Sequence, residues 1–178
     1  SAVLRSMVAI AEAISRGVDQ TSSMGSLPGW ITGHTRQRDR SAIEYHYDVS
    51  NAFYEMVLGP SMTYTCAVYP DQDATLEEAQ YTKYDLVSQK LRLDSGMRLL
   101  DVGCGWGPMA LHAAAHHGVH VVGITSSEAQ AALARRRVDE AGLARQVEIR
   151  VQDYRDVTDG PFDAISSIGM FEHVGEQR

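Results

Sequence analysis

The residues best suited to chemistry form a glycine-rich turn in the second half of the chain. Its sequence is Gly103-Cys104-Gly105-Trp106-Gly107, and it follows the apolar run Leu99-Leu100-Asp101-Val102. Glycine is needed where a backbone bends sharply and where a ligand must approach the chain closely. The pattern therefore predicts a strand that runs into a nucleotide-type cofactor site. A tight turn that binds nothing is the alternative interpretation.

Two features of the surrounding sequence argue against a nicotinamide dinucleotide. The dinucleotide fingerprint requires a third small residue at the position where Pro108 stands. The segment Gly123-Ile124-Thr125, at the end of the next apolar run, contains no acid that could bind a ribose. An NAD-binding domain is therefore a distant alternative.

Outside the turn, Cys66 and Glu172 carry the side chains of most chemical interest. Cys66 lies in the segment Tyr64-Thr65-Cys66-Ala67, where it is either a ligand or a small buried hydrophobic residue. Glu172 follows the last apolar run, at the edge where α/β sheets bind ligands, and its alternative is a solvated loop acid. Cys104 is expected to pack inside the turn. Because the two cysteines form no C-x-x-C pair, the sequence predicts neither a disulfide scaffold nor a metal site.

The elements that must position these residues alternate between strands and helices. The predicted strands are Met97–Val102, Val119–Ile124, Val147–Val151 and Phe162–Ile168, with helices after the first two. This alternation predicts an α/β fold with a parallel, doubly wound sheet in the order 3-2-1-4. An apolar last strand would leave an exposed sheet edge, so we expect the chain to be a C-terminally truncated fragment of a longer protein.

Capping residues predict two of the helices. Thr75 with Glu78 forms a capping box for a helix from Leu76 to about Leu91, and Ser127 with Gln130 forms one for a helix that ends near Gly142. An amphipathic helix over residues 2–16 and a helix from Ser50 or Asn51 through Leu58 precede them. These elements divide the chain into an N-terminal helix and linker (1–40), a helical segment on the substrate side (41–95) and the N-terminal part of a cofactor-binding domain (96–178).

Composition and charge narrow the class of protein. Hydrophobic residues make up 44% of the chain and charged residues 22%, which is typical of a soluble globular protein. The net charge of −7 would repel nucleic acid. No apolar run approaches the roughly 20 residues that span a bilayer, and residues 1–16 lack the features of a signal peptide. Together with two unpaired cysteines, this predicts a cytoplasmic protein.

Several motifs in a fixed order give a family resemblance over about residues 41–178. Besides the glycine turn they are Tyr45-His46-Tyr47-Asp48-Val49-Ser50-Asn51, Met62-Thr63-Tyr64-Thr65-Cys66-Ala67, Val122-Gly123-Ile124-Thr125 with Gln130, Asp153-Tyr154-Arg155, and Ser167-Ile168-Gly169-Met170-Phe171-Glu172-His173-Val174-Gly175. The chain resembles the cyclopropane fatty acid synthase family, which includes the mycolic acid cyclopropane synthases. These are class I, Rossmann-like S-adenosylmethionine methyltransferases. Within the family it looks closest to the actinobacterial unsaturated fatty acid methyltransferases.

The resemblance implies a role for each matching residue. The S-adenosylmethionine cofactor would be bound by Tyr64, Thr65, Asp101, Gly103, Gly105, Thr125, Gln130, Asp153, Tyr154 and Ile168. Within this set, Thr125 and Gln130 take the place of the usual ribose-binding acid, and Tyr154 flanks the adenine. The catalytic residues would be Cys66, Glu172 and Tyr47. Cys66 and Glu172, with the backbone of Ile168, would bind a bicarbonate ion that acts as the base.

The implied reaction is methyl or methylene transfer to the cis double bond of unsaturated fatty acyl chains of phospholipids. An alkene is a poor nucleophile, so the sulfonium methyl must be held in line with the π bond. The resulting carbocation can be stabilised by aromatic rings, at about 0.5–2 kcal/mol each. Loss of a proton from the transferred methyl closes a cyclopropane, whereas loss from a neighbouring carbon gives a methylene branch. The position of the base therefore decides the product.

The resemblance also implies where the protein acts. Its expected partners are unsaturated phospholipid acyl chains at the inner face of the plasma membrane, a second copy in a homodimer, and an accessory reductase. Two alternatives stay open: a methyltransferase that acts on N or O of a small molecule, and a non-catalytic cofactor-binding fragment that needs a second polypeptide. The fragment alone is expected to be inactive.

Overall fold

The computed structural model describes residues 51–170. The predicted helix over residues 2–16 and the catalytic candidates Tyr47 and Glu172 lie outside the described residues.

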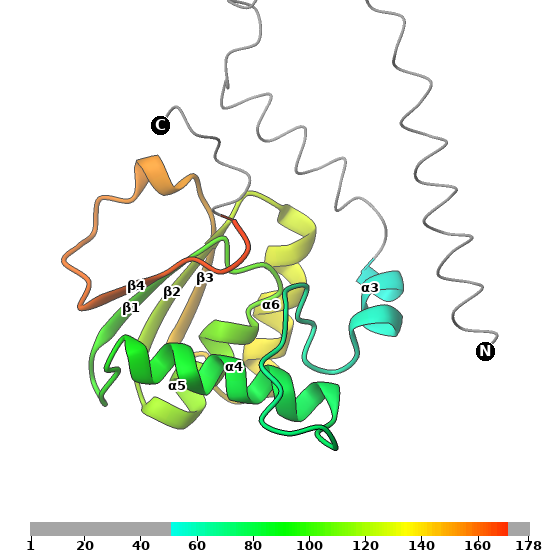
Figure 1. The fold of residues 1–178 in the computed structure, drawn as a ribbon. Coiled ribbons are helices and arrows are strands. Elements are labelled where there is room, and N and C mark those ends of the chain that lie inside the picture. Colours follow the sequence, from blue (N-terminus) through cyan, green and yellow to red (C-terminus); the bar gives the residue numbers. More distant parts are fainter. Residues whose placement is uncertain (1–50, 171–178) are drawn as a thin grey trace, which may run out of the picture. The chain divides into compact units, whose positions relative to one another are not determined.

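A parallel sheet of four strands forms the centre of the described region (Figure 1). Its strands are β1 (Arg98–Val102), β2 (His120–Thr125), β3 (Val147–Val151) and β4 (Ala164–Ser166). They lie in the order β3-β2-β1-β4, and Asp101 of β1 pairs with both Gly123 of β2 and Ser166 of β4. The α/β class and the strand order 3-2-1-4 predicted from the sequence are confirmed.

The helices of the described region begin and end close to their predicted positions. They are α3 (Asn51–Leu58), α4 (Leu76–Lys90), α5 (Pro108–His117) and α6 (Glu128–Glu140), and a 3-10 helix (Tyr154–Asp156) follows β3. The capping box of α4 is confirmed: Thr75 Oγ1 accepts the N–H of Glu78 at 3.3 Å, and Glu78 Oε2 accepts the N–H of Thr75 at 2.8 Å. None of these helices is long and apolar enough to cross a membrane.

The sheet has two apolar faces because successive side chains of a strand point in opposite directions. Leu99 lies on the helical face, where it belongs to a core with Met109 of α5 and Ala134 of α6. Leu100, the next residue, lies on the other face in a separate cluster against which Phe162 packs. Helices therefore cover one face, and the segment between β3 and β4 crosses the other (Figure 1).

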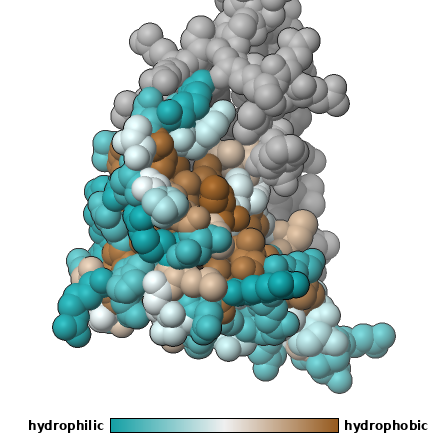
Figure 2. Space-filling model, turned by 90° about the vertical axis from the view of Figure 1, so that its left-hand side faces the viewer, coloured by the Kyte–Doolittle hydropathy of each residue, from teal (hydrophilic) through white to brown (hydrophobic). Residues whose placement is uncertain are grey.

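The side of the molecule on which β4 lies carries apolar residues at its surface. Figure 2 shows them gathered across the middle of this view. Ile165, in the middle of β4, is 59% exposed. The sheet edge formed by β4 in the described region thus has the exposed apolar character that the sequence predicts.

The fourth strand is shorter than predicted. The sequence predicts Phe162–Ile168, whereas only Ala164–Ser166 pairs with β1. Before the strand, the ring of Phe162 packs against Arg98, whose Cζ lies 4.7 Å from the centre of the ring. After the strand, the chain bends at Gly169, where φ is 84°. Part of this apolar run therefore serves packing and a turn, and not strand pairing.

Candidate active site

The predicted cofactor residues lie at the carboxyl ends of the four strands. Gly103 follows β1, Thr125 ends β2, Asp153 follows β3 and Ile168 follows β4. Because the strands are parallel, these ends meet at one edge of the sheet. This is the edge at which α/β proteins bind ligands.

The glycine bend after β1 has two glycines with different surroundings. Gly103 and Gly105 have φ of 76° and 56°, in the left-handed region that favours glycine. A Cβ on Gly103 would lie 2.8 Å from Cβ of Met170, so this glycine makes room for the turn after β4. A Cβ on Gly105 would have no heavy atom of the described residues within 4 Å. Backbone is therefore open at Gly105, as a site approached closely by a ligand requires.

The bend is held in place from below by the second strand. The N–H groups of Gly103 and Cys104 both donate to the carbonyl oxygen of Ile124 at 2.9 Å. Cys104 is buried, and a Cβ on Gly123 would lie 3.2 Å from its Sγ, so the thiol packs between β2 and the bend. The packing role predicted for Cys104 agrees with this placement.

Asp101 is the buried acid beneath the bend. It is 2% exposed, and its Oδ1 accepts a hydrogen bond from Ser166 Oγ at 2.7 Å. Its Oδ2 is buried and has no hydrogen-bond partner among the described residues. Burial raises the pKa of Asp101 to about 6, and the bond from Ser166 offsets only part of this effect. A cationic group of a ligand would satisfy the unpaired oxygen and favour the ionised carboxylate.

Thr125 and Gln130 are joined directly at the end of β2. Thr125 Oγ1 donates to Gln130 Oε1 at 2.8 Å, and both residues are buried. The capping box predicted for α6 is therefore wrong in one half. Ser127 Oγ does accept the N–H of Gln130, at 3.2 Å, but the N–H of Ser127 donates to Thr125 Oγ1 instead of to Gln130. Thr125 thus accepts the backbone N–H of Ser127 that Gln130 would accept in a complete capping box.

The segment that contains Thr65 lies beside the glycine bend. A Cβ on Gly169 would lie 2.6 Å from Cγ2 of Thr65, and its neighbour Met170 fills the space at Gly103. The turn at 169–170 therefore bridges two predicted cofactor segments that are far apart in sequence. The loop between α3 and α4 and the bend after β1 meet at this turn.

Tyr64 and Cys66 flank Thr65 and are both exposed. Tyr64 is 60% exposed, and its ring contacts Tyr54 edge-on with the ring centres 5.8 Å apart. The exposure of Cys66 rules against its alternative interpretation as a small buried hydrophobic residue. Both side chains are accessible to a ligand at this position.

Lys83 of α4 is a functional candidate that sequence reasoning missed. It is only 7% exposed, and its Nζ donates to Thr65 Oγ1 at 2.7 Å. Burial lowers the pKa of Lys83 to about 8, and the charge that Cys66 can carry acts against this shift. A signal was present in the sequence, because Lys83 lies four residues after Ala79 and four before Val87, on the stripe of α4 that faces the core.

Helix α3 is fastened to the glycine bend through Trp106. Trp106 is 2% exposed, and its Nε1 donates to Asn51 Oδ1 at 3.0 Å. Its ring packs against Tyr54 with the ring centres 4.7 Å apart. The backbone oxygen of Trp106 accepts a hydrogen bond from Arg137 of α6 at 2.7 Å. Trp106 thus holds α3 and α6 in place around the bend.

Asp153 and Tyr154 occupy the short 3-10 helix after β3. Asp153 Oδ1 accepts hydrogen bonds from the N–H and from Nε of Arg155, at 2.9 and 2.8 Å. Tyr154 is 40% exposed, and Cζ of Arg155 lies 5.5 Å from the centre of its ring. The Asp153 carboxylate is therefore occupied by Arg155, while the Tyr154 ring is partly exposed.

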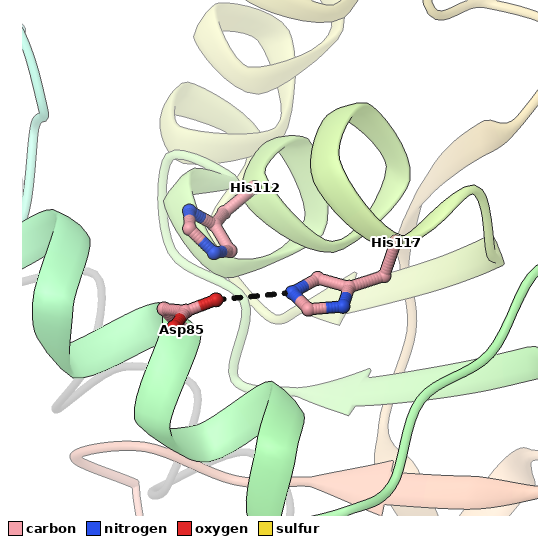
Figure 3. Close-up of side chains that lie close together, drawn as sticks. All are labelled: Asp85, His112 and His117. Atoms are coloured by element: carbon pink, nitrogen blue, oxygen red, sulfur yellow. Dashed lines mark ion pairs between the residues drawn. The ribbon is translucent and has the colours of Figure 1, made fainter.

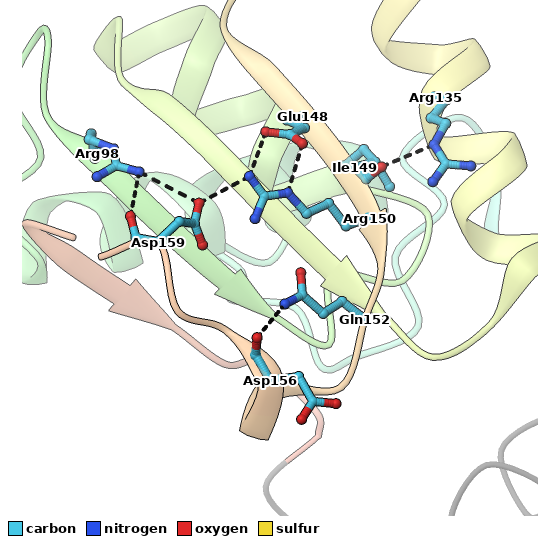
Figure 4. Close-up of polar contacts among 8 residues, drawn as sticks. All are labelled: Arg98, Arg135, Glu148, Ile149, Arg150, Gln152, Asp156 and Asp159. Atoms are coloured by element: carbon cyan, nitrogen blue, oxygen red, sulfur yellow. Dashed lines mark hydrogen bonds and ion pairs between the residues drawn. The ribbon is translucent and has the colours of Figure 1, made fainter. Parts of the chain in front are cut away.

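Ion pairs tie the segment after this 3-10 helix to the strands (Figure 4). Arg150 of β3 pairs with Glu148 at 2.7 Å and with Asp159 at 3.0 Å. Arg98 of β1 donates to the backbone oxygen of Asp159 at 3.1 Å. Gln152 Nε2 donates to the backbone oxygen of Asp156 at 2.8 Å. Polar contacts at the surface thus set the position of the segment that carries Tyr154.

Ile168 is the last of the described candidates, and it is partly buried against the core on the helical face. Its backbone lies directly before the turn that contacts Thr65 and Gly103. Cys66 and Glu172 are predicted to converge on one anion, and because Glu172 lies outside the described residues this convergence stays a prediction. The same holds for Tyr47.

Comparison with known proteins gives the family. A family profile described as mycolic acid cyclopropane synthetase matches residues 34–178. A probable fatty acid methyltransferase of Mycobacterium tuberculosis is 56% identical over 142 residues, which are 80% of this chain and 33% of the relative. The cyclopropane-fatty-acyl-phospholipid synthase of Escherichia coli is 48% identical over 130 residues, which are 73% of this chain and 32% of the relative. The chain thus spans about a third of these curated relatives.

A solved structure shows the same fold. The mycolic acid cyclopropane synthase CmaA1, complexed with SAH and CTAB, matches with a TM-score of 0.73 and 41% identity over 78% of this chain and 48% of that chain. The described residues therefore have the class I S-adenosylmethionine methyltransferase fold. From the sequence motifs, the strand order and these matches, the chain belongs to the mycolic acid cyclopropane synthetase family.

Proposed function

We propose that the protein to which this chain belongs transfers a methyl group from S-adenosylmethionine to the cis double bond of unsaturated fatty acyl chains of phospholipids. The product would be a cyclopropane or a methylene- or methyl-branched fatty acid. One observation carries the proposal: the open backbone at Gly105 lies at the same sheet edge as Thr125, with the Tyr64–Cys66 segment joined to it through Gly169. The names of the fatty acid methyltransferase and phospholipid synthase relatives support the acyl substrate.

The residues present fit the proposed cofactor. When bound, S-adenosylmethionine supplies an electrophilic methyl group on a positively charged sulfur. Asp101, with one buried oxygen unpaired, would favour a cationic amino group near the bend. Gly105 leaves room for close approach, and the exposed ring of Tyr154 offers a surface for the adenine. Thr125 and Gln130 supply the polar groups at the end of β2, where the sheet has no acid.

The charges around Cys66 are compatible with the proposed bicarbonate base. The Lys83 ammonium lies close enough to Cys66 to interact with it electrostatically, and it is held by Thr65. A positive charge at this position would favour a small anion bound between Cys66 and Glu172. The ring of Tyr64, which belongs to the same segment, is exposed and would stabilise a nearby cation through its face.

Methyl transfer into lipid is the direct test. The full-length protein would be incubated with methyl-labelled S-adenosylmethionine and phospholipid vesicles that hold cis-monounsaturated chains, with fully saturated vesicles as the matched control. We expect label in the fatty acids of the unsaturated vesicles alone, and mass spectrometry of the released acids distinguishes a ring from a methylene branch. Label found on soluble acceptors alone would contradict the lipid substrate. Intact SAH binding without any transfer would favour the non-catalytic alternative.

The role of the anion is tested separately. Removal of bicarbonate from the buffer, and the substitution Cys66→Ser, should each lower transfer to the unsaturated vesicles. Cys104→Ser serves as a comparison, because that thiol packs under the bend and does not face the proposed anion. Transfer that is indifferent to both bicarbonate and Cys66 would refute the assignment of the base while leaving the transfer reaction itself intact.

A further inference from the structure

We propose that Asp85, His112 and His117 form a binding site for a divalent transition-metal ion of the Zn²⁺ type. Two imidazoles and one carboxylate are a donor set that Zn²⁺ accepts, with a remaining position for water. The site is separate from the glycine bend and does not depend on the proposed function. It also departs from the sequence analysis, which predicts no metal site; Asp85 lies far from the two histidines in the sequence.

The three side chains converge from two helices (Figure 3). Asp85 belongs to α4, and His112 and His117 belong to α5. Each residue offers one ligand atom, and these atoms all lie within 4.8 Å of one another. His117 Nε2 lies 3.5 Å from Asp85 Oδ1. Because Zn–N bonds are about 2.0–2.1 Å long, an ion would draw the three atoms closer by small side-chain rotations.

The Nε2 atoms of both histidines have no hydrogen-bond partner among the described residues. His112 is 7% exposed, and Nε2 of His112 and Nε2 of His117 are both buried without a partner among the described residues. Buried polar atoms in proteins are nearly always satisfied, and Nε2 of His117 has only the 3.5 Å contact with Asp85 Oδ1, so both atoms call for an explanation. One bound cation would satisfy both nitrogens and compensate the Asp85 carboxylate.

The Asp85 carboxylate is oriented by a neighbouring side chain. Gln89 Nε2 donates to Asp85 Oδ2 at 2.6 Å, which leaves Oδ1 directed to His117. Such a supporting hydrogen bond is typical of metal-binding carboxylates.

The competing explanation is packing of aromatic rings. The ring centre of His112 lies 4.7 Å from that of His116 and 4.8 Å from that of Tyr81. This packing accounts for the position of the rings, and the 3.5 Å contact with Asp85 Oδ1 engages Nε2 of His117, but Nε2 of His112 still has no hydrogen-bond partner among the described residues. His116 is exposed and does not belong to the set of converging ligand atoms. Packing alone predicts no bound ion, whereas the proposal predicts an ion whose binding requires His117.

Metal titration of the full-length protein distinguishes them. After removal of metal with a chelator, Zn²⁺ binding would be followed by calorimetry and Co²⁺ binding by its visible absorption. His117→Ala and Asp85→Asn should each lower the affinity for Zn²⁺ by about tenfold or more. Even the loss of a residue that only supports a metal ligand has an effect of this size. His120→Ala, at an exposed histidine of β2, is the matched control and should bind as the unaltered protein does.

Folding and the ligand set are checked in the same experiment. Zn²⁺ should raise the melting temperature of the unaltered protein and of His120→Ala, but not that of His117→Ala. Circular dichroism would establish that the Asp85→Asn and His117→Ala proteins are folded. The proposal is overturned if no ion binds, if both substitutions leave binding unchanged, or if His116→Ala abolishes binding while His117→Ala does not.

Discussion

Lys83 Nζ donates a hydrogen bond to Thr65 Oγ1, 18 residues earlier in the chain, at 2.7 Å. The bond joins helix α4 to the segment in which Cys66 and Tyr64 are exposed. A lysine that is 7% exposed is unusual, because burial of an ammonium group is costly unless it is bonded. The position of Thr65, and with it that of its neighbours, therefore depends on a charged group in the core.

Substitution of Lys83 by Met tests this dependence. Met keeps the length and apolar stem of the side chain, so the protein should fold, but the charged hydrogen bond to Thr65 is lost. A hydrogen bond from a charged group contributes about 1.5–3 kcal/mol, so labelled methyl transfer by the full-length protein should fall about 10- to 100-fold. Lys90→Met, at an exposed position of the same helix, should leave transfer unchanged. Equal activity of both variants would show that Lys83 has a structural role alone.

Asp101 should make stability depend on pH. Its pKa is about 6 in the folded protein and near 3.8 when unfolded, so the native state binds this proton more tightly. The contribution is present below about pH 4 and is lost as the pH rises through 6, at a cost of about 3 kcal/mol in the free energy of unfolding. Asp101→Asn removes the effect, so urea unfolding of the two proteins between pH 4 and 7 should diverge. Parallel pH profiles would contradict the buried, raised-pKa carboxyl.

Gly105 and Gly142 form a matched pair for testing the cofactor site. Both have positive φ, and at both a Cβ would meet no heavy atom of the described residues within 4 Å. Alanine at either position should cost a similar 1–2 kcal/mol, roughly, from the left-handed backbone. Only Gly105→Ala should also weaken SAH binding measured by calorimetry, by about tenfold or more, because its methyl group points into the proposed cofactor space. Equal loss of affinity in both variants would place the cofactor elsewhere.

The two thiols should differ in reactivity. Cys66 is exposed, whereas Cys104 is buried and its pKa is raised well above the usual value, mainly by burial. In the native protein, a thiol reagent should therefore modify Cys66 quickly and Cys104 only after unfolding. Cys66→Ser should remove the fast phase and Cys104→Ser should leave it. A fast phase that disappears with Cys104 would mean that the glycine bend opens in solution.

The order of elements could be predicted because local signals agreed with the global fold. The box of Thr75 and Glu78 and the run Val147–Val151 depend on residues that are neighbours in sequence. The same logic overestimated β4, because an apolar residue such as Phe162 looks alike in sequence whether it pairs in a strand or packs under Arg98. Hydrophobicity marks burial, and it does not specify the backbone conformation that achieves it.

The site could be predicted only where its residues belong to a motif. The glycine bend and the polar pair Thr125 and Gln130 are recognisable as short segments, and the structure places them at one edge. Lys83 has no such mark, because its partner Thr65 lies in a different segment and a lysine on a helix is ordinarily solvated. The three candidate metal ligands could not be predicted either, because Asp85 lies on α4 and the two histidines lie on α5, and these helices come together only in the folded chain.

The two ends of the candidate site, at Tyr154 and at Gly103, are held by different kinds of interaction. At the first end, Arg150 forms ion pairs. The pair with Asp159 holds the segment that carries Tyr154 at the protein surface, where about 1 M salt, with a Debye length of about 3 Å, weakens such pairs. The bend at Gly103 is instead fixed by backbone hydrogen bonds over a buried core. A rise in ionic strength should therefore loosen the end of the site near Tyr154, while the glycine bend keeps its shape.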